Sequence, residues 1–138
     1  MRTAVDTNVF SALWSGEPTA TSMAALLAQS RNAGSVVVCG AVYAELLAHP
    51  RASQAFVDSF LARTAVTVDF GMDEPTWREA ARGFTAYAAR RRASSGTQAK
   101  RLLVDFVVGA HATLTSDRLL SLDPKRYVQD YPNLLVLP

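Results

Sequence analysis

The sequence predicts an α/β fold with three layers, in which a parallel sheet of about five strands is flanked by helices. Short apolar or β-branched runs alternate along the chain with longer segments that carry apolar residues at helical spacing. The short runs are almost continuously apolar, which is typical of strands buried on both faces. Alternation of such strands with helices favours a parallel sheet covered on both sides.

The expected strands are five short runs. The clearest is Val36 to Cys39, which is β-branched and apolar throughout its first three positions. The five runs occupy residues 2–5, 36–39, 66–70, 118–122 and 134–137.

Helices are expected in the segments between the strands. The longest begins at Asp73-Glu74-Pro75, where acids in the first turn and an early proline are typical of a helix N-terminus. It ends at Arg90-Arg91-Arg92, and residues 93–97 form a loop. The six expected helices cover residues 8–14, 19–32, 41–48, 53–63, 73–92 and 99–114.

Length and composition are those of one folded domain, expected to span residues 1–138. Hydrophobic residues make up 49% of the chain and charged residues 19%, which excludes a disordered protein. We expect no membrane association, because no stretch of about 18 uncharged apolar residues occurs. With no signal peptide visible and Cys39 as the single cysteine, a reducing, cytoplasmic location is expected.

Four acidic residues stand at related places in this arrangement. Asp6 follows the first expected strand and Asp123 the fourth, while Glu45 lies in the helix after the second. Asp105 interrupts an apolar run in the helix before the fourth strand. Taken singly, each acid has another interpretation: Asp6 as a helix cap, Asp123 as a turn residue, Glu45 as a solvated helix residue and Asp105 as a partner of Arg101. Groups beyond the carboxyl ends of parallel strands line the ligand crevice, so we expect these acids to converge.

Converging carboxylates predict a site for a hard divalent cation. They repel one another and require a counter-charge. Mg²⁺ or Mn²⁺ accepts carboxylate and water oxygens, and can lower the pKa of a bound water and clamp a phosphodiester. No His and Cys set with zinc spacing is present. The sequence therefore predicts Mg²⁺ (or Mn²⁺) at this site.

The chain resembles the PIN-domain ribonucleases and, among them, the VapC-type toxins of bacterial toxin–antitoxin pairs. The resemblance covers essentially the whole chain, and the order and spacing of the motifs agree with the family. The matching segments are Val5-Asp6-Thr7-Asn8-Val9, Ala44-Glu45-Leu46, Asp105-Phe106-Val107-Val108-Gly109-Ala110-His111-Ala112 and Leu119-Leu120-Ser121-Leu122-Asp123-Pro124.

The resemblance implies a fold, a site and an activity. It implies a PIN-like three-layer sandwich with strand order 3-2-1-4-5, and a metal-dependent endoribonuclease that cleaves RNA by a metal-activated water. It further implies a small antitoxin as partner, which often reaches the site with an arginine, and a homodimer. Asn8 and Ser121 would support the site, although the family usually has Thr at the position of Ser121. The catalytic and metal-binding residues implied are Asp6, Glu45, Asp105 and Asp123.

Basic residues gather near the expected site. The chain has 14 Lys and Arg residues and 12 Asp and Glu residues. When the four acids above are set apart from the 12, 8 acidic residues remain against 14 basic ones. Such a surface around an acidic centre suits a polyanionic strand. For arginines that end a helix, complementing the helix dipole is an equally good interpretation. The candidate RNA-binding residues are Arg90, Arg91, Arg92, Arg101 and Lys125.

Two other functions remain open at this level. One is a catalytically silent PIN-like domain that binds RNA or a partner protein. The other is a receiver-type signalling module with Asp69 as phosphoacceptor, although Asp6 has no acidic neighbour and the last strand lacks a lysine. Asp117 is expected at the opposite end of the sheet from the site, and His111 either in the core or behind the residues that form the site.

Overall fold

Five parallel strands form one sheet in the order β3-β2-β1-β4-β5. The computed structural model describes all residues, 1–138. Ala4 of the central strand pairs with Val37 on one side and Leu119 on the other, which confirms the expected strand order. The strands are β1 (Arg2–Val5), β2 (Ser35–Cys39), β3 (Val66–Asp69), β4 (Arg118–Leu120) and β5 (Leu135–Leu137).

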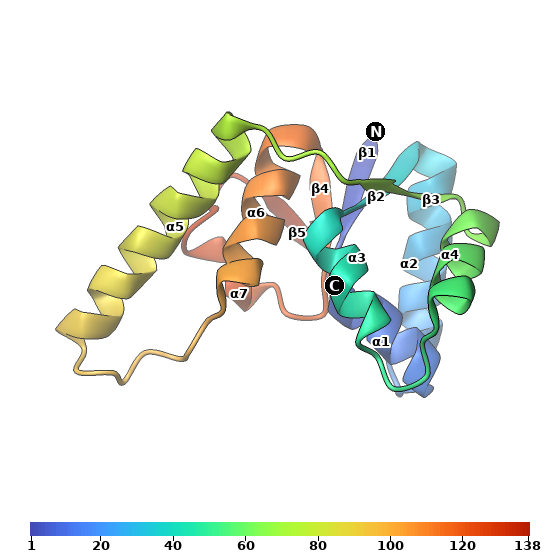
Figure 1. The fold of residues 1–138 in the computed structure, drawn as a ribbon, viewed down its shortest axis with the longest axis horizontal. Helices are drawn as coiled ribbons and strands as arrows, with labels where there is room; N and C mark the ends of the chain where they lie inside the picture. The colour runs from blue at the N-terminus through green and yellow to red at the C-terminus, as the bar shows by residue number, and fades with distance from the viewer.

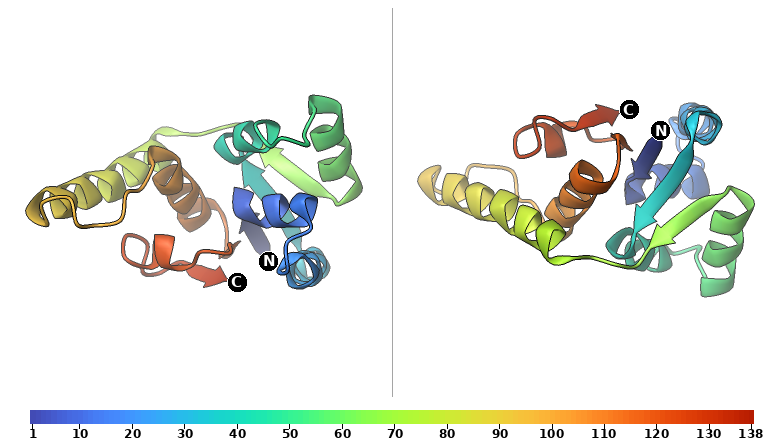
Figure 2. Two further views of the ribbon diagram at one scale, coloured as in Figure 1. Left: turned by 90° about the horizontal axis from the view of Figure 1, so that it is seen from below. Right: turned by 90° about the horizontal axis from the view of Figure 1, so that it is seen from above.

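Seven helices connect and cover these strands (Figure 1). The helix α2 packs on β1 and β2, whereas α6 packs on β1 and β4. The two views of Figure 2 show α5 lying beside α6 with its C-terminal end projecting away from the sheet. The helices are α1 (Thr7–Ser15), α2 (Ala20–Ala33), α3 (Gly40–Leu47), α4 (Gln54–Arg63), α5 (Glu74–Ala93), α6 (Leu103–Thr115) and α7 (Lys125–Val128).

A tyrosine fixes the position of α6 against α5. The ring of Tyr131 lies where a Cβ on Gly109 would overlap it, and its hydroxyl lies 2.8 Å from where a Cβ on Gly83 would stand. That hydroxyl donates a hydrogen bond to the carbonyl of Phe106 at 2.8 Å. Two glycines on facing helices thus make the slot that holds α5, α6 and the C-terminal segment together.

The helix α6 begins at Leu103 and not at residue 99 as the periodicity predicts. The preceding segment is bound to the end of α5 instead of continuing a helix. The backbone N–H of Arg101 donates to the Tyr87 hydroxyl at 2.7 Å, and that of Gln98 donates to Ser94 Oγ at 3.3 Å. Asp105 therefore stands in the first turn of α6, not in its interior.

The fourth strand is also shorter than expected, ending at Leu120. Ser121 still donates its N–H to the Leu137 carbonyl at 2.9 Å, but the Leu122 N–H turns to the Asn8 side chain at 3.0 Å. The chain leaves the sheet there and forms α7, a helix of 4 residues that is too short for periodicity to reveal.

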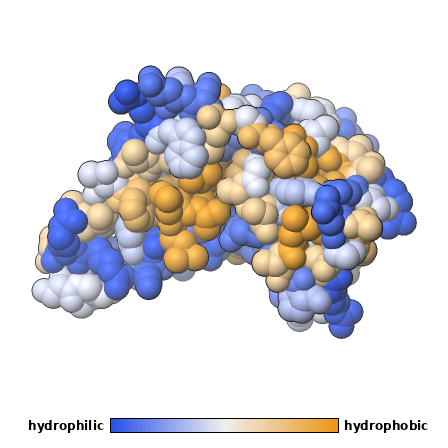
Figure 3. Space-filling view, viewed as in Figure 1, coloured by the Kyte–Doolittle hydropathy of each residue, from blue (hydrophilic) through white to orange (hydrophobic).

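Apolar side chains are exposed on the face seen in Figure 3, over α6 and between α5 and α3. A cavity of about 350 Å³ on this face is lined by Cys39, Phe70, Trp77, Leu103 and other residues. Phe70 is 69% exposed and Trp77 50%, well above what a core aromatic shows.

No helix in the structure combines the length and the apolar character that crossing a bilayer requires.

Candidate active site

Asp6 occupies the junction between β1 and α1. Its backbone is extended (φ −81°, ψ 155°), and its Oδ1 accepts the Thr7 N–H at 2.8 Å, so the residue caps α1. Its Oδ2 accepts two further hydrogen bonds, from Ser121 Oγ at 2.9 Å and from the Tyr127 hydroxyl at 2.6 Å. The side chain is only 3% exposed and forms no ion pair. The three donors satisfy the hydrogen bonding of this buried carboxylate, but its charge has no ion-pair partner, which favours the binding of a cation.

Ser121 and Asn8 hold Asp6 in this orientation. The Ser121 hydroxyl donates to Asp6 and accepts hydrogen bonds from Asn8 Nδ2 at 3.3 Å and from the Asp123 N–H at 3.1 Å. Asn8 Oδ1 in turn accepts the Leu122 N–H. With its one donor and both acceptor positions used, the hydroxyl is fixed. The two residues predicted to support the site thus connect the end of β1 to the end of β4.

Glu45 approaches from α3, on the other side of Asp6. Its Oε1 accepts the hydroxyl proton of Thr7 at 2.7 Å, and Thr7 is the residue whose N–H binds Asp6. Glu45 is half-buried and, like Asp6, forms no ion pair. Its Oε2 accepts no hydrogen bond from another protein group.

Asp105 and Asp123 share one cation, Arg126 of α7. Arg126 Nη1 lies 3.4 Å from Asp105 Oδ1, and Arg126 Nε lies 3.3 Å from Asp123 Oδ2. Burial disfavours the charge of this guanidinium, but the carboxylates of Asp105, Asp6 and Asp123 outweigh that and raise the pKa of Arg126. Arg101, considered above as a partner for Asp105, lies instead 4.0 Å from Asp123 Oδ2.

The four acids belong to one connected network at the carboxyl end of the sheet. Thr7 links Glu45 to Asp6, Ser121 links Asp6 to the Asp123 backbone, and Arg126 links Asp123 to Asp105. No group of three or more His, Cys, Asp or Glu side chains is arranged to hold a metal ion directly. The donor set still fits a hard divalent cation, because it consists of carboxylates and two of them, Asp6 and Glu45, have no cation of their own.

The basic residues divide into two groups. Both terminal nitrogens of Arg90 bind the two oxygens of Asp130 at 2.9 Å, and Asp130 is 7% exposed. This bidentate pair ties α5 to the segment after α7. The guanidinium of Arg90, a candidate RNA-binding residue above, is therefore engaged in a structural ion pair. The other candidates have no bidentate partner; they are Arg91, Arg92, Arg101 and Lys125.

Three residues make contacts in the site that sequence analysis does not predict: Thr7, Arg126 and Tyr127. The hydroxyl of Thr7 directly follows Asp6 in the sequence, and the charge of Arg126 lies three residues after Asp123. Both positions were available as signals. Tyr127 is fully buried, with its hydroxyl on Asp6. A buried tyrosine hydroxyl requires a partner, but only the fold brings residues 121 positions apart together.

Residues set aside by sequence analysis lie away from the network. Asp117 accepts the Arg2 N–H at 2.6 Å, at the opposite end of the sheet, as expected. His111 is 2% exposed, which confirms its expected place in the core, and its Nε2 lies 3.0 Å from Asp69 Oδ2. Asp69, the phosphoacceptor of the receiver alternative, also pairs with Arg2 at 3.7 Å.

Comparison with known proteins places this architecture in a family. A search of curated proteins finds no match to the sequence. Among solved structures, the chain is similar to one in the crystal structure of VapBC2 from Rickettsia felis bound to a DNA fragment from their promoter. The TM-score is 0.56 and the identity 17%, with 99% of this chain and 98% of that chain covered, so the likeness concerns the fold. The PIN domain family model matches residues 3–130. This chain, whose acids are joined across β1, α3, α6 and the end of β4, therefore belongs to the PIN-domain family.

Proposed function

We propose that this protein is a Mg²⁺- or Mn²⁺-dependent endoribonuclease, the toxin of a type II toxin–antitoxin pair. The observation that carries the proposal is the network joining Asp6, Glu45, Asp105 and Asp123, in which two carboxylates, Asp6 and Glu45, form no ion pair. PIN-family membership supports a nuclease reaction. The rival within the family is a silent domain that binds RNA without cutting it.

The four acids would hold the divalent ion, which when bound supplies charge that polarises the scissile phosphodiester and activates water. Ser121 and Asn8 keep the Asp6 carboxylate oriented, with the Tyr127 hydroxyl fixing its Oδ2. Glu45 Oε2, which no protein group occupies, is the oxygen available to accept a proton from the attacking water.

The basic residues near the network would hold the RNA backbone. Arg101 lies 4.0 Å from Asp123, and Lys125 is exposed at the start of α7, two residues after that acid. Their side chains can bind phosphates on either side of the scissile bond, and such binding weakens as salt increases.

The direct test is a cleavage assay on total cellular RNA with Mg²⁺ or Mn²⁺ and with EDTA. Asp6→Asn and Asp105→Asn should abolish metal-dependent cleavage while circular dichroism shows the folded state. Asp58→Asn is the matched control, since Asp58 is exposed on α4 and binds only the Tyr43 hydroxyl. Full activity of both site variants would refute the assignment, and RNA binding without cleavage by the wild type would favour the silent domain.

We also propose two protein partners, a small antitoxin and a second copy of the chain. The resemblance to VapC-type toxins supports both, and the similar solved structure is of VapBC2. The exposed Phe70, Trp77 and Leu103 give the apolar surface that a protein partner covers. Light scattering of the purified protein should give twice the mass of one chain, and a monomer at all concentrations would contradict the homodimer.

A further inference from the structure

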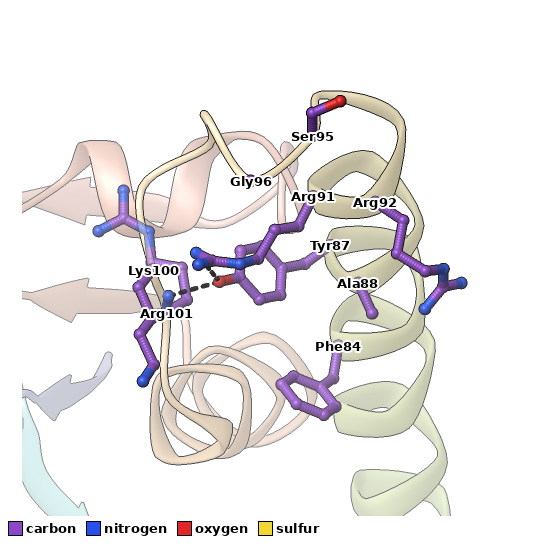
Figure 4. Close-up of a pocket in the computed structure, with 9 residues that line it drawn as sticks. All are labelled: Phe84, Tyr87, Ala88, Arg91, Arg92, Ser95, Gly96, Lys100 and Arg101. Carbon is purple, nitrogen blue, oxygen red and sulfur yellow. Dashed lines mark hydrogen bonds between the residues drawn. The ribbon is translucent and has the colours of Figure 1, made fainter.

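A cavity lies apart from the acidic network, between the C-terminal half of α5 and the segment that leads to α6. Figure 4 shows it enclosed by α5 on one side and by residues 95–101 on the other. Its volume is about 570 Å³, within the range of sites that hold small molecules or single nucleotides. The residues that matter to its chemistry are Phe84, Tyr87, Arg91, Arg92, Lys100 and Arg101.

The charge around this cavity is uniformly positive. Four cationic side chains line it, and the chain contains no acidic residue from position 80 to position 104. Arg91 donates only to neutral acceptors, the Gln98 carbonyl at 3.2 Å and the Tyr87 hydroxyl at 3.5 Å. Arg92 and Lys100 are exposed and form no ion pair, so the cavity attracts an anion.

The inner wall of the cavity is aromatic and rigid. Phe84 presents its ring toward the open space, with Ala88 leaving room beside it (Figure 4). The rings of Phe84 and Tyr87 stack at 6.1 Å and 30°, and Phe106 packs against both. The Tyr87 hydroxyl accepts the Arg101 N–H at 2.7 Å, which holds the far wall in place.

The cavity connects to the acidic network through Arg101. The Arg101 side chain lines the cavity, and its Nη1 lies 4.0 Å from Asp123 Oδ2. A second, smaller cavity shares Tyr87 and Arg101 with the first and is also lined by Lys125 and Arg126. Arg126 contacts Asp105 and Asp123, so positively charged side chains run from the acids to the cavity.

We propose that this cavity binds one unpaired nucleotide of an RNA strand whose neighbouring part lies at the acidic network. The base packs against Phe84 and the phosphate binds Arg91. Lys100 and Arg92, which lie on opposite sides of the cavity in Figure 4, bind the phosphates of neighbouring nucleotides. An aromatic wall beside cationic groups is the combination that single-stranded nucleic acid uses, because each base offers a flat face and each nucleotide a phosphate. A paired base has no free face, so the site favours single-stranded over double-stranded RNA.

This inference rests on the proposed function in one respect, that the neighbouring part of the RNA strand lies at the acidic network. The test of the cavity measures binding and does not need cleavage. The affinity of the full-length protein for a fluorescein-labelled single-stranded RNA is measured by anisotropy in EDTA. Lys100→Ala, Arg92→Ala and Phe84→Leu are compared with Arg78→Ala, a control on the same helix whose side chain is 76% exposed. Lys100 and Arg92 are exposed, so their replacement leaves the fold intact and keeps the test decisive if Phe84→Leu unfolds.

Phe84→Leu should weaken binding by about tenfold, the size of one lost base–aromatic contact. Lys100→Ala and Arg92→Ala should each weaken it several-fold and lower the salt slope of log K by about 1. Arg78→Ala should bind as the wild type does, and an RNA duplex of the same sequence should bind more weakly. Equal binding of the duplex, or wild-type binding by all three cavity variants, would overturn the proposal.

Two further arms separate this proposal from its rivals. A poly-glutamate peptide that binds the cavity while single-stranded RNA does not would assign it to an acidic protein segment and overturn the RNA site. If the wild type binds RNA through the cavity but never cleaves it with Mn²⁺, the nuclease proposal fails and the cavity stands. If the wild type cleaves RNA but the cavity variants bind RNA normally, the cavity proposal fails and the nuclease proposal stands.

Discussion

The Tyr127 hydroxyl donates a 2.6 Å hydrogen bond to Oδ2 of Asp6, and both side chains are buried. The contact joins the end of the first strand to α7, near the C-terminus. Burial, together with the Asp6 carboxylate, raises the pKa of Tyr127 far above its ordinary value. The hydroxyl therefore remains a hydrogen-bond donor to Asp6 Oδ2 as the solution becomes alkaline.

Replacing Tyr127 with Phe should destabilise the protein and impair the site together. The variant leaves Asp6 Oδ2 with one donor in place of two, and a buried hydrogen bond to a charged group contributes about 1.5–3 kcal/mol. Urea unfolding at pH 7 should show a free-energy loss of that order, with reduced cleavage. Tyr43→Phe, which removes an exposed hydroxyl bound to Asp58, is the control. Stability equal to the wild type would show that the contact is dispensable.

Arg126 should compete with a divalent cation for the carboxylates of Asp105 and Asp123. Removing its charge with Arg126→Gln should strengthen Mn²⁺ binding in calorimetry on the order of three- to tenfold, the range of a half-exposed ion pair worth roughly 1 kcal/mol. In EDTA the same variant should unfold more readily than the wild type, because the acids then face one another uncompensated. Arg78→Gln should change neither quantity, and weaker Mn²⁺ binding by Arg126→Gln would show that the guanidinium assists the cation.

Gly109→Ala should disturb the contact between α5 and α6. A Cβ there overlaps the ring of Tyr131, and the hydrogen bond from the Tyr131 hydroxyl to the Phe106 carbonyl holds the ring in that position. Overpacking of this kind costs about 1–3 kcal/mol, which thermal or urea unfolding would report. Gly71→Ala is the control, because its Cβ would meet only one atom, at 3.5 Å. A Gly109→Ala protein as stable as that control would contradict the packing described for Tyr131.

Stability should fall as the solution becomes alkaline. Burial raises the pKa of the Cys39 thiol and of the Tyr131 and Tyr127 hydroxyls, so the folded state keeps protons that the unfolded state releases. The free energy of unfolding is constant below the ordinary pKa of these groups and decreases with each pH unit above about 9.

Urea unfolding between pH 7 and about 10.5 measures that slope. Cys39→Ala should flatten its first part, and Tyr131→Phe should flatten the part above about pH 10. A wild-type free energy of unfolding that increases with pH in this range would contradict the expected loss of stability.

Much of the architecture follows from local sequence. The apolar runs became strands within a residue or two, because continuous β-branched segments form strands that are buried on both faces. The start of α6 could not be placed in this way. Its first predicted turn is held by Tyr87 and Ser94, side chains of another helix, and that competition is invisible to a periodic pattern.

The arrangement of the candidate site could be predicted only in part. Asp6 and Asp123 follow adjacent parallel strands, so their meeting at one edge follows from the strand order. Asn8 and Ser121 connect them through hydrogen bonds, but the assignment of the four acids to catalysis and metal binding, and of Asn8 and Ser121 to their support, stays a prediction. Arg90 was placed with the RNA-binding residues because a charge run does not reveal which of its members pairs with a buried acid.

The sequence by itself determined the strands, the order of the acids along the chain and the basic character of residues 78–101. These depend on side-chain chemistry and on neighbours a few residues away. Only the tertiary structure decided that Tyr127 binds Asp6, that Arg126 joins Asp105 to Asp123, and that the end of α5 encloses a cavity. Each of these contacts brings together residues distant in the chain, and a hydroxyl or guanidinium has many partners of equal chemistry until the fold leaves one within reach.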